Sequence, residues 1–333
     1  MKLRVGLLGG GSWGTTVAAL VARNAPVLLW ARDVATVDEI NREHTNRRYL
    51  PEAILPDDLR ATHDAAEAVE RADVVIMGVP SQGFRGVLEQ VRDHVRPWVP
   101  VVSLTKGLEL STGRRMTELV EELLPGHPVG VLSGPNLARE IMAGYAASSV
   151  IAMEDEIIVA ALQRLFRSGL FRVYTNHDVI GCELGGVLKN VMAIAVGMGD
   201  GQGAGENTRA ALITRGLAEM TRLGVALGGE PATFAGLAGL GDLVATCTSP
   251  QSRNRYVGVE LGKGRHIDAI IAEMFMVAEG VKSVPTVMAL AERHGVRMPI
   301  AQEVHQVVQG QSTARQAFRG LLRLAAGAES DPG

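Results

Sequence analysis

Lys189 is the single charged side chain in the stretch 184–191, which reads Leu-Gly-Gly-Val-Leu-Lys-Asn-Val. A lysine ammonium can stabilise negative charge that develops on a substrate oxygen and can then protonate that oxygen. At about 100° per residue, a helix through this stretch places its large apolar side chains on one face and Lys189 on the other, beside Gly185 and Gly186. Lys189 is therefore the candidate catalytic residue. The competing interpretation is a solvated lysine on a helix whose glycines serve packing.

A glycine-rich turn near the N-terminus has the spacing of a dinucleotide-binding loop. Gly9, Gly11 and Gly14 form G-x-G-x-x-G, and an apolar stretch precedes them while a helical pattern and a second apolar stretch follow. The first glycine permits a tight turn, the second lets the backbone approach a pyrophosphate, and the third lets the helix pack on the strand. The phosphates would lie on the N–H groups of the helix N-terminus. We expect a dinucleotide here, with an unliganded glycine turn as the alternative.

The same turn also fits G-x-S-x-G, in which Ser12 between Gly10 and Gly14 would be the nucleophile of a serine hydrolase. That nucleophile stands on a sheet built from earlier strands, whereas a single apolar stretch precedes Ser12. The dinucleotide interpretation is therefore favoured over the hydrolase.

Arg32 follows the second apolar stretch, at the position that distinguishes the two nicotinamide dinucleotides. An acid there binds the ribose 2′-hydroxyl of NAD, and an arginine there accommodates the 2′-phosphate of NADP. The chain has Arg32 first and Asp33 one residue later. We expect NADP(H) to be preferred and keep NAD(H) as the alternative. Arg32 has two other interpretations, stacking on the adenine and a solvated arginine at a helix start.

Lys106 follows another predicted strand and lies beside Gly107, which lets the backbone of a ligand or loop come close. Ligands of a parallel sheet lie beyond the carboxyl ends of its strands, so Lys106 is a candidate for binding an anionic ligand. A surface lysine is the alternative. The further predicted strands lie at about 74–79, 99–104, 129–132 and 148–153, with helical patterns such as 84–95 and 116–124 between them.

A second candidate anion site lies late in the chain, around Arg253. Ser249 before Pro250 is typical of a helix N-cap and first turn, so Ser252, Arg253 and Asn254 would fall near a helix N-terminus. A helix dipole, a guanidinium, a hydroxyl and an amide in one place suit a phosphate group. The alternative is a capped surface helix with a solvated arginine.

The elements that must position these residues change in kind part-way along the chain. Strands alternate with helices up to about residue 177, and helical patterns follow from 179 onward. The fold class is therefore α/β, with an N-terminal doubly wound, mainly parallel sheet of the Rossmann type followed by an all-α C-terminal domain. We expect a dinucleotide-binding domain at 1–177, a helical substrate and catalytic domain at 178–326, and a disordered tail at 327–333.

Composition limits the classes of function. A formal net charge of −3 gives no general attraction to nucleic acid, so an anionic ligand must be held by local positive groups. The apolar N-terminal stretch after Lys2 and Arg4 could pass for a signal peptide, but three glycines and Trp13 interrupt it, and no membrane insertion is expected. The two cysteines suggest a reducing cytoplasm, and no histidine pair has metal-ligand spacing.

Seven motifs are spread over nearly the whole chain. They are Gly-Gly-Gly-Ser-Trp-Gly (9–14), Thr-Lys-Gly-Leu-Glu (105–109), Ser-Gly-Pro-Asn-Leu-Ala (133–138), Leu-Gly-Gly-Val-Leu-Lys-Asn-Val (184–191), Leu-Gly-Asp-Leu (240–243), Gln-Ser-Arg-Asn-Arg (251–255) and Val-Ala-Glu-Gly (277–280). Together these motifs resemble bacterial NAD(P)-dependent glycerol-3-phosphate dehydrogenase. The resemblance implies interconversion of dihydroxyacetone phosphate and sn-glycerol 3-phosphate for phospholipid synthesis, a homodimer, and a small phosphorylated substrate.

The resemblance also assigns site residues, with Lys189 as the catalytic acid or base. The cofactor would contact Ser12, Trp13, Arg32, Lys106, Ala138, Arg253, Val277 and Glu279, in addition to the glycine turn. The substrate would contact Lys106, Gly134, Asn136, Lys189, Asp242, Ser252, Arg253 and Asn254.

The chain departs from the family pattern in two places. Asn136 stands where many relatives carry a small hydroxyl residue, and the turn at 24–26 is one residue shorter than usual, which affects the setting of Arg32. Two other functions compete with the dehydrogenase. One is a related lysine-dependent hydroxy-acid reductase, which would not require a phosphate on its substrate. The other is an NADP(H)-sensing protein without turnover.

Overall fold

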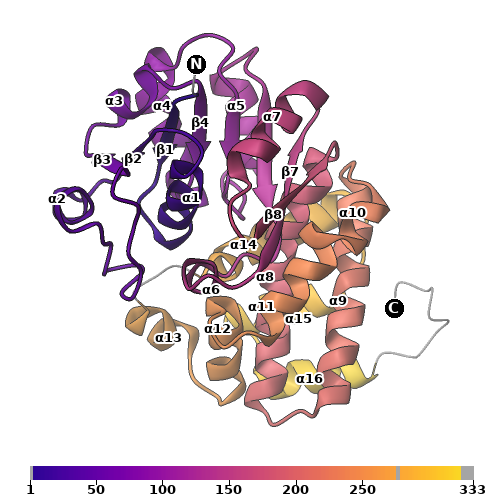
Figure 1. Ribbon diagram of the computed structural model, residues 1–333. Helices are drawn as coiled ribbons and strands as arrows, with labels where there is room; N and C mark the ends of the chain where they lie inside the picture. Colours follow the sequence, from indigo (N-terminus) through magenta and orange to yellow (C-terminus); the bar gives the residue numbers. More distant parts are fainter. Residues whose placement is uncertain (1–2, 275–277, 324–333) are drawn as a thin grey trace. The chain divides into compact units, whose positions relative to one another are not determined.

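The computed structural model describes residues 3–274 and 278–323, so Val277 and the tail predicted at 327–333 lie outside the described part. The chain forms two compact units (Figure 1). Within the described residues, the first contains the chain up to Glu109 together with Arg114–Val179, and the second contains Leu110–Gly113 and the chain from Ile180 onward. The short segment 110–113 thus belongs to the second unit, which the sequence did not predict. That the units are separate domains with the expected boundaries remains a prediction.

The first unit is built on one eight-stranded sheet in the order β3-β2-β1-β4-β5-β6-β7-β8. Neighbouring strands run parallel, except that β6 and β7 pair antiparallel. The prediction of a doubly wound, mainly parallel sheet is confirmed. The strands are β1 (Val5–Leu8), β2 (Val27–Trp30), β3 (Arg60–Thr62), β4 (Val74–Met77), β5 (Val101–Ser103), β6 (Val129–Ser133), β7 (Ala147–Met153) and β8 (Phe171–Asn176).

Helices cover both faces of this sheet, because successive strand side chains point to opposite faces (Figure 1). Leu7 belongs to the apolar cluster under α1 and α7, and Leu8 belongs to the cluster under α3, α4 and α5. The helices are α1 (Ser12–Ala22), α2 (Val34–Glu43), α3 (Ala65–Glu70), α4 (Ser81–Val91), α5 (Met116–Leu123), α6 (Ala138–Met142) and α7 (Glu156–Phe166).

Two strands, β3 and β8, were not predicted from the sequence. β3 has three residues and lies at an edge of the sheet, and β8 lies at the other edge. Along β8 the buried residues Phe171 and Val173 alternate with the exposed residues Arg172 and Tyr174. Strand β3 is short and β8 alternates between buried and exposed residues, so neither has the continuous apolar run that identified the central strands.

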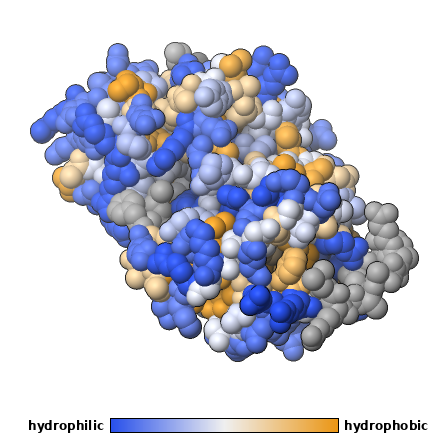
Figure 2. Space-filling model, turned by 90° about the horizontal axis from the view of Figure 1, so that it is seen from below, coloured by the Kyte–Doolittle hydropathy of each residue, from blue (hydrophilic) through white to orange (hydrophobic). Residues whose placement is uncertain are grey.

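From Ile180 onward, the described part of the second unit contains helices joined by turns and no strand, which confirms the predicted all-α region. Its central helix α8 is long and apolar enough to span a bilayer, but 94% of its most apolar window is buried, so it is a core helix of a soluble protein. The surface seen in Figure 2 is largely hydrophilic with scattered hydrophobic residues. The helices are α8 (Val179–Gly201), α9 (Glu206–Ala226), α10 (Pro231–Ala235), the π-helical turn η2 (Leu237–Gly241), α11 (Asp242–Thr248), α12 (Arg253–Gly262), α13 (Ile267–Glu273), α14 (Glu279–Arg293), α15 (Pro299–Val308) and α16 (Ala314–Arg323).

The glycines at the end of α8 are helical and pack closely against α12. A Cβ on Gly197 would stand 2.2 Å from the carbonyl oxygen of Arg255, and a Cβ on Gly258 would stand 2.2 Å from that of Ile194. The backbones of α8 and α12 are therefore in direct contact. The next helix, α9, has Gly205 as its N-cap.

Candidate active site

The glycine turn between β1 and α1 has the geometry of a dinucleotide cradle. Gly9 has a φ of 128°, and a Cβ on Gly14 would stand 2.0 Å from the carbonyl oxygen of Gly9, so the chain itself requires glycine at both positions. Around Gly11 no atom lies within 4 Å of the Cβ position. The open space at Gly11 is where the backbone can approach a ligand. Gly11 caps α1 without a side-chain hydrogen bond and no acid lies in the first turn, so the positive end of the helix dipole suits an anion.

Asn46 holds this turn in place and was not identified from the sequence. Its fully buried side chain donates through Nδ2 to the carbonyl oxygen of Gly10 at 2.9 Å and to Thr15 Oγ1 at 2.9 Å. Asn46 lies in the loop after α2, far from the turn in sequence, and nothing local to it signals this role. Trp13 packs edge-on against Phe171, with ring centroids 6.4 Å apart.

Arg32 is exposed and lies two residues after the end of β2, and Asp33 is the N-cap of α2. Asp33 Oδ2 accepts a hydrogen bond from Thr36 Oγ1 at 2.9 Å, and Asp33 Oδ1 accepts one from the backbone N–H of Ala35 at 3.3 Å. The hydrogen bond from Thr36 lowers the pKa of Asp33, and the charge of Arg48 lowers it further. The acid near the end of β2 therefore has protein partners, while the arginine side chain is accessible.

The ends of β5 and β6 bring Lys106 and Gly134 together. Lys106 Nζ donates to the carbonyl oxygen of Gly134 at 2.8 Å. Gly134 has a φ of 129°, which favours glycine. Asn136 Oδ1 accepts a hydrogen bond from Ser149 Oγ at 3.1 Å, so its amide is tied to β7. Ala138 begins α6, two residues further on. The sequence-predicted residues of the first unit thus gather at the strand ends, as a parallel sheet requires.

Lys189 is buried, so the solvated-lysine alternative is wrong. The residue is 6% exposed, and its Nζ lies 2.8 Å from Asp242 Oδ1 and 2.5 Å from Thr246 Oγ1. Thr246 Oγ1 in turn donates to Asp242 Oδ1 at 3.2 Å. Asp242 and Thr246 are four residues apart on α11, which places them on one helix face. Asp242 was predicted from the sequence and Thr246 was not. The one feature that could have indicated Thr246 is its position four residues after Asp242 in a helix.

Gly185, one of the two glycines predicted to lie beside Lys189, serves helix packing. A Cβ on Gly185 would stand 2.5 Å from the carbonyl oxygen of Ala238, so Gly185 lets η2 approach α8.

Cys247, next to Thr246 on α11, is fully buried, and burial raises the pKa of its thiol to about 12. The thiol therefore stays protonated at neutral pH and does not compete with Lys189 for proton transfer.

The predicted phosphate-binding residues lie at the N-terminus of α12, but the cap differs from the prediction. Ser252 is the N-cap and its Oγ accepts a hydrogen bond from the N–H of Arg255 at 3.2 Å, whereas Ser249 caps only a turn, at the N–H of Gln251. Arg253 begins the helix and keeps exposed surface. Partial desolvation lowers the pKa of its guanidinium, and the charge of Glu279 opposes that change. An arginine stays charged at any physiological pH.

Asn254 connects α12 with two other helices. Its Nδ2 donates to Asn190 Oδ1 at 2.9 Å, and its Oδ1 accepts from the N–H of Gly280 at 3.0 Å. Asn190 follows Lys189 on α8, and Gly280 follows Glu279 on α14. The second unit thus brings together the neighbourhoods of Lys189, Arg253 and Glu279. The predicted contacts of Asn254 and the other residues with substrate remain predictions.

Two family models cover most of the chain. Residues 4–159 match the NAD-dependent glycerol-3-phosphate dehydrogenase N-terminus, and residues 178–319 match the C-terminus of the same family. The chain belongs to the NAD-dependent glycerol-3-phosphate dehydrogenase family. The resemblance inferred from the seven motifs is thereby confirmed.

Individual members of this dehydrogenase family are similar over nearly the full length. Glycerol-3-phosphate dehydrogenase [NAD(P)+] 2 of Sphingopyxis alaskensis is 72% identical over 333 residues, which is all of both chains. Glycerol-3-phosphate dehydrogenase [NAD(P)+] 1 of Mycobacterium tuberculosis is 58% identical, covering 96% of this chain and 94% of its own. The crystal structure of glycerol-3-phosphate dehydrogenase from Coxiella burnetii superposes with a TM-score of 0.92 at 39% identity, covering 97% of this chain and 99% of its own.

Proposed function

We infer that this chain is an NAD(P)+-dependent glycerol-3-phosphate dehydrogenase, which interconverts dihydroxyacetone phosphate and sn-glycerol 3-phosphate. The observation that carries the chemistry is the buried ion pair of Lys189 with Asp242, 2.8 Å apart. A relative bearing the name of this activity matches the whole chain with 72% identity, and another matches 96% of it with 58% identity. The substrate class is therefore a small phosphorylated metabolite.

The residues of the first unit fit a nicotinamide dinucleotide. The open space at Gly11 and the first turn of α1, which has no side-chain cap, suit a pyrophosphate. Ser12, Trp13, Lys106 and Ala138 would complete the cofactor site, with Arg253, Val277 and Glu279 from the rest of the chain. When bound, the nicotinamide supplies or accepts the hydride.

NADP(H) is the preferred cofactor in this proposal. The accessible guanidinium of Arg32 suits a 2′-phosphate, whereas Asp33 already accepts hydrogen bonds from Ala35 and Thr36. An acid that caps a helix is less available to a ribose hydroxyl. NAD(H) remains the second cofactor.

Lys189 would be the proton donor to the ketone oxygen in the reducing direction. A lysine ammonium has three N–H donors, and two of them are directed at Asp242 and Thr246. The third can be directed at a substrate oxygen, where it stabilises the developing negative charge and then transfers its proton. Asp242 and Thr246 orient the ammonium, and the burial of the group strengthens its interaction with an oxyanion. In the oxidising direction the neutral amine would accept the hydroxyl proton.

The N-terminus of α12 would bind the substrate phosphate. Arg253 supplies a guanidinium, Ser252 a hydroxyl and the helix a positive dipole end, and all three favour a phosphate dianion. Lys106, Gly134, Asn136 and Asn254 are the further substrate contacts in this proposal.

The enzyme would act in the cytoplasm as a homodimer. Cys182 and Cys247 are buried and are not joined by a disulfide, which suits a reducing compartment. The homodimer rests on the family resemblance, and sedimentation velocity at micromolar concentration tests it.

Steady-state kinetics with NADPH and NADH, each with dihydroxyacetone phosphate or dihydroxyacetone, test the assignment. We expect turnover that requires the phosphate and is faster with NADPH at limiting cofactor. Equal kcat/KM for the two ketones would favour the hydroxy-acid reductase alternative. NADPH binding without oxidation in the presence of dihydroxyacetone phosphate would instead identify a cofactor-sensing protein.

A further inference from the structure

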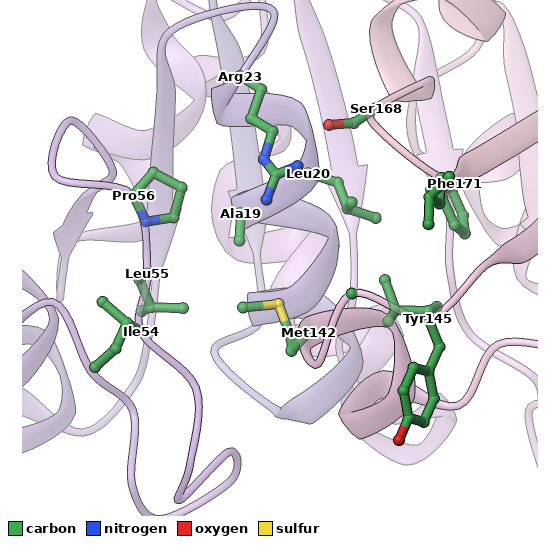
Figure 3. A pocket seen from close by; sticks show the side chains of 13 residues that line it. Ala19, Leu20, Arg23, Ile54, Leu55, Pro56, Met142, Tyr145, Ser168 and Phe171 are labelled. Atoms are coloured by element: carbon green, nitrogen blue, oxygen red, sulfur yellow. The ribbon is translucent and has the colours of Figure 1, made fainter.

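A cavity of about 370 Å³ lies in the first unit, at the C-terminal half of α1 (Figure 3). The glycine turn is at the opposite end of that helix. Four segments form the cavity: α1, the loop 54–56, the end of α6 with the turn after it, and the turn that leads into β8. Its volume falls in the range of small-molecule sites. Among the described lining residues there is no residue of the predicted cofactor or substrate sites.

The wall of the cavity is mainly apolar, and its rim carries large exposed apolar side chains. Leu20 of α1 and Met142 of α6 project into it from two sides (Figure 3). At the rim, Ile54 is 72% exposed, Leu170 63% and Tyr145 64%. Three such side chains around one cavity form an exposed apolar patch, which on a soluble protein marks a surface that binds something.

One cation is directed into this apolar site. The guanidinium of Arg23 points toward the middle of the cavity, and the hydroxyl of Ser168 faces it from the other side (Figure 3). Arg23 Nη1 lies 3.3 Å from the position of a Cβ on Gly169, so the guanidinium rests against the turn at 168–170. In the described part of the chain, no carboxylate forms an ion pair with Arg23.

The turn that carries Arg23 is held firmly. The next residue, Asn24, donates through Nδ2 to the carbonyl oxygen of Leu165 at 2.9 Å and to that of Arg167 at 2.7 Å. These bonds tie the end of α1 to the end of α7. The backbone at Arg23 is thus fixed beside the cavity, so the main conformational freedom that this residue loses on binding an anion is that of its side chain.

We propose that this cavity binds a linear amphipathic anion, an alkyl chain that ends in one carboxylate or phosphate group. The head group pairs with Arg23 and accepts a hydrogen bond from the Ser168 hydroxyl. The chain lies between α1 and α6 and is covered at the rim by Ile54 and Leu170. At roughly 30 Å³ per small group, a cavity of 370 Å³ holds a ligand of about twelve non-hydrogen atoms. The site is independent of the dehydrogenase assignment.

Isothermal titration calorimetry of the full chain with sodium decanoate tests the proposal. We expect one saturable site, with affinity at least ~10-fold weaker in Arg23→Gln, because the charged hydrogen bond is lost. Decanol, which lacks the charge, should bind weakly and equally to both proteins. Decyl phosphate distinguishes a preference for a phosphate head group from one for a carboxylate. Leu170→Ser, a change at an exposed rim position, should weaken decanoate binding through the chain.

Matched controls separate this site from others. Arg167→Gln removes a neighbouring exposed arginine outside the cavity and should leave decanoate affinity unchanged. Arg253→Ala should also leave it unchanged. Loss of decanoate binding in Arg253→Ala, or equal affinity in Arg23→Gln and the parent chain, would overturn the proposal. It would also be overturned if Leu170→Ser changed the sedimentation coefficient of the unliganded protein, since the rim would then contact a second copy.

Discussion

Lys189 Nζ lies 2.8 Å from Asp242 Oδ1, and both side chains are almost completely buried. Burying two charges is costly unless they pair and their remaining hydrogen-bonding groups are satisfied. Thr246 meets that need by accepting from Lys189 and donating to Asp242. An enzyme gains from this arrangement because the ammonium is held in one orientation and still has a donor for substrate.

Lys189→Ala should lower kcat by at least ~10², because the proton donor to the ketone oxygen is removed. Asp242 would then be a buried unpaired carboxylate, so the thermal midpoint must be measured alongside steady-state kinetics. Lys189→Met fills more of the volume and serves as the matched variant. A folded Lys189→Met enzyme with near-normal kcat would refute the acid/base role.

Arg253→Ala should chiefly raise the KM for dihydroxyacetone phosphate, since a phosphate clamp acts on substrate and transition state alike. Steady-state kinetics should show at least a ~10-fold increase, the loss of one charged hydrogen bond. Arg255 on the same helix is not expected to bind the phosphate, because its guanidinium forms an ion pair with Asp200 at 2.6 Å. If KM stays at its original value in Arg253→Ala, the phosphate assignment fails.

Arg32→Ala should weaken NADPH binding more than NADH binding, because only NADPH carries the 2′-phosphate. Fluorescence titration of both cofactors measures the two dissociation constants. We expect NADPH affinity to fall ~10-fold or more, as one charged hydrogen bond is lost. Equal losses for the two cofactors would indicate that Arg32 stacks on the adenine they share.

Glu219→Gln should reduce the pH dependence of stability. Glu219 is buried, its carboxylate accepts from the N–H groups of Ile300 and Ala301, and burial raises its pKa from 4.5 to about 7. An acid whose pKa is raised on folding stabilises the folded state at low pH. For Glu219 this contribution to the free energy of unfolding is about 3 kcal/mol below pH 4.5, and it is lost as the pH rises through 7.

Urea denaturation at pH 5 and pH 8 checks this prediction. The difference in the free energy of unfolding between the two pH values should shift by about 2 to 3 kcal/mol in Glu219→Gln, because glutamine does not titrate. An identical difference in both proteins would mean that Glu219 does not titrate in this range.

Gly258→Ala should destabilise the second unit by about 1 to 3 kcal/mol. The added Cβ would stand 2.2 Å from the carbonyl oxygen of Ile194 and 2.8 Å from the Cα of Gly197, so α8 and α12 must separate. Gly86→Ala in α4 is the control, since nothing lies within 4 Å of its Cβ position and alanine favours a helix. Chemical denaturation should order the proteins with Gly86→Ala at least as stable as the parent. Equal midpoints for Gly258→Ala and the parent would contradict the close packing.

Much of the fold was predictable, because its signals are local. The central strands are continuous apolar runs, and the glycine turn lies where strand, turn and helix follow in order. The edge strands β3 and β8 were missed because their residues alternate between core and solvent or are few. The sequence predicted Ser249 as the N-cap of α12, but the N-cap is Ser252. Serine favours this position, and the sequence has a serine at both places, so the residue type alone did not distinguish them.

The sequence by itself determined the residue types of the site: a lysine in an apolar helix, a glycine-rich turn, and a serine, arginine and asparagine at a helix start. It also determined the family, because those motifs recur together. Only the tertiary structure decided that Lys189 is buried with Asp242 and Thr246, that Gly185 serves helix packing, and that Asn46 holds the glycine turn. Burial and hydrogen-bond partners come from segments that are distant in sequence, such as Lys189 and Thr246, which are 57 residues apart. No local sequence pattern predicts that these two side chains meet in space, because their contact depends on how whole helices pack.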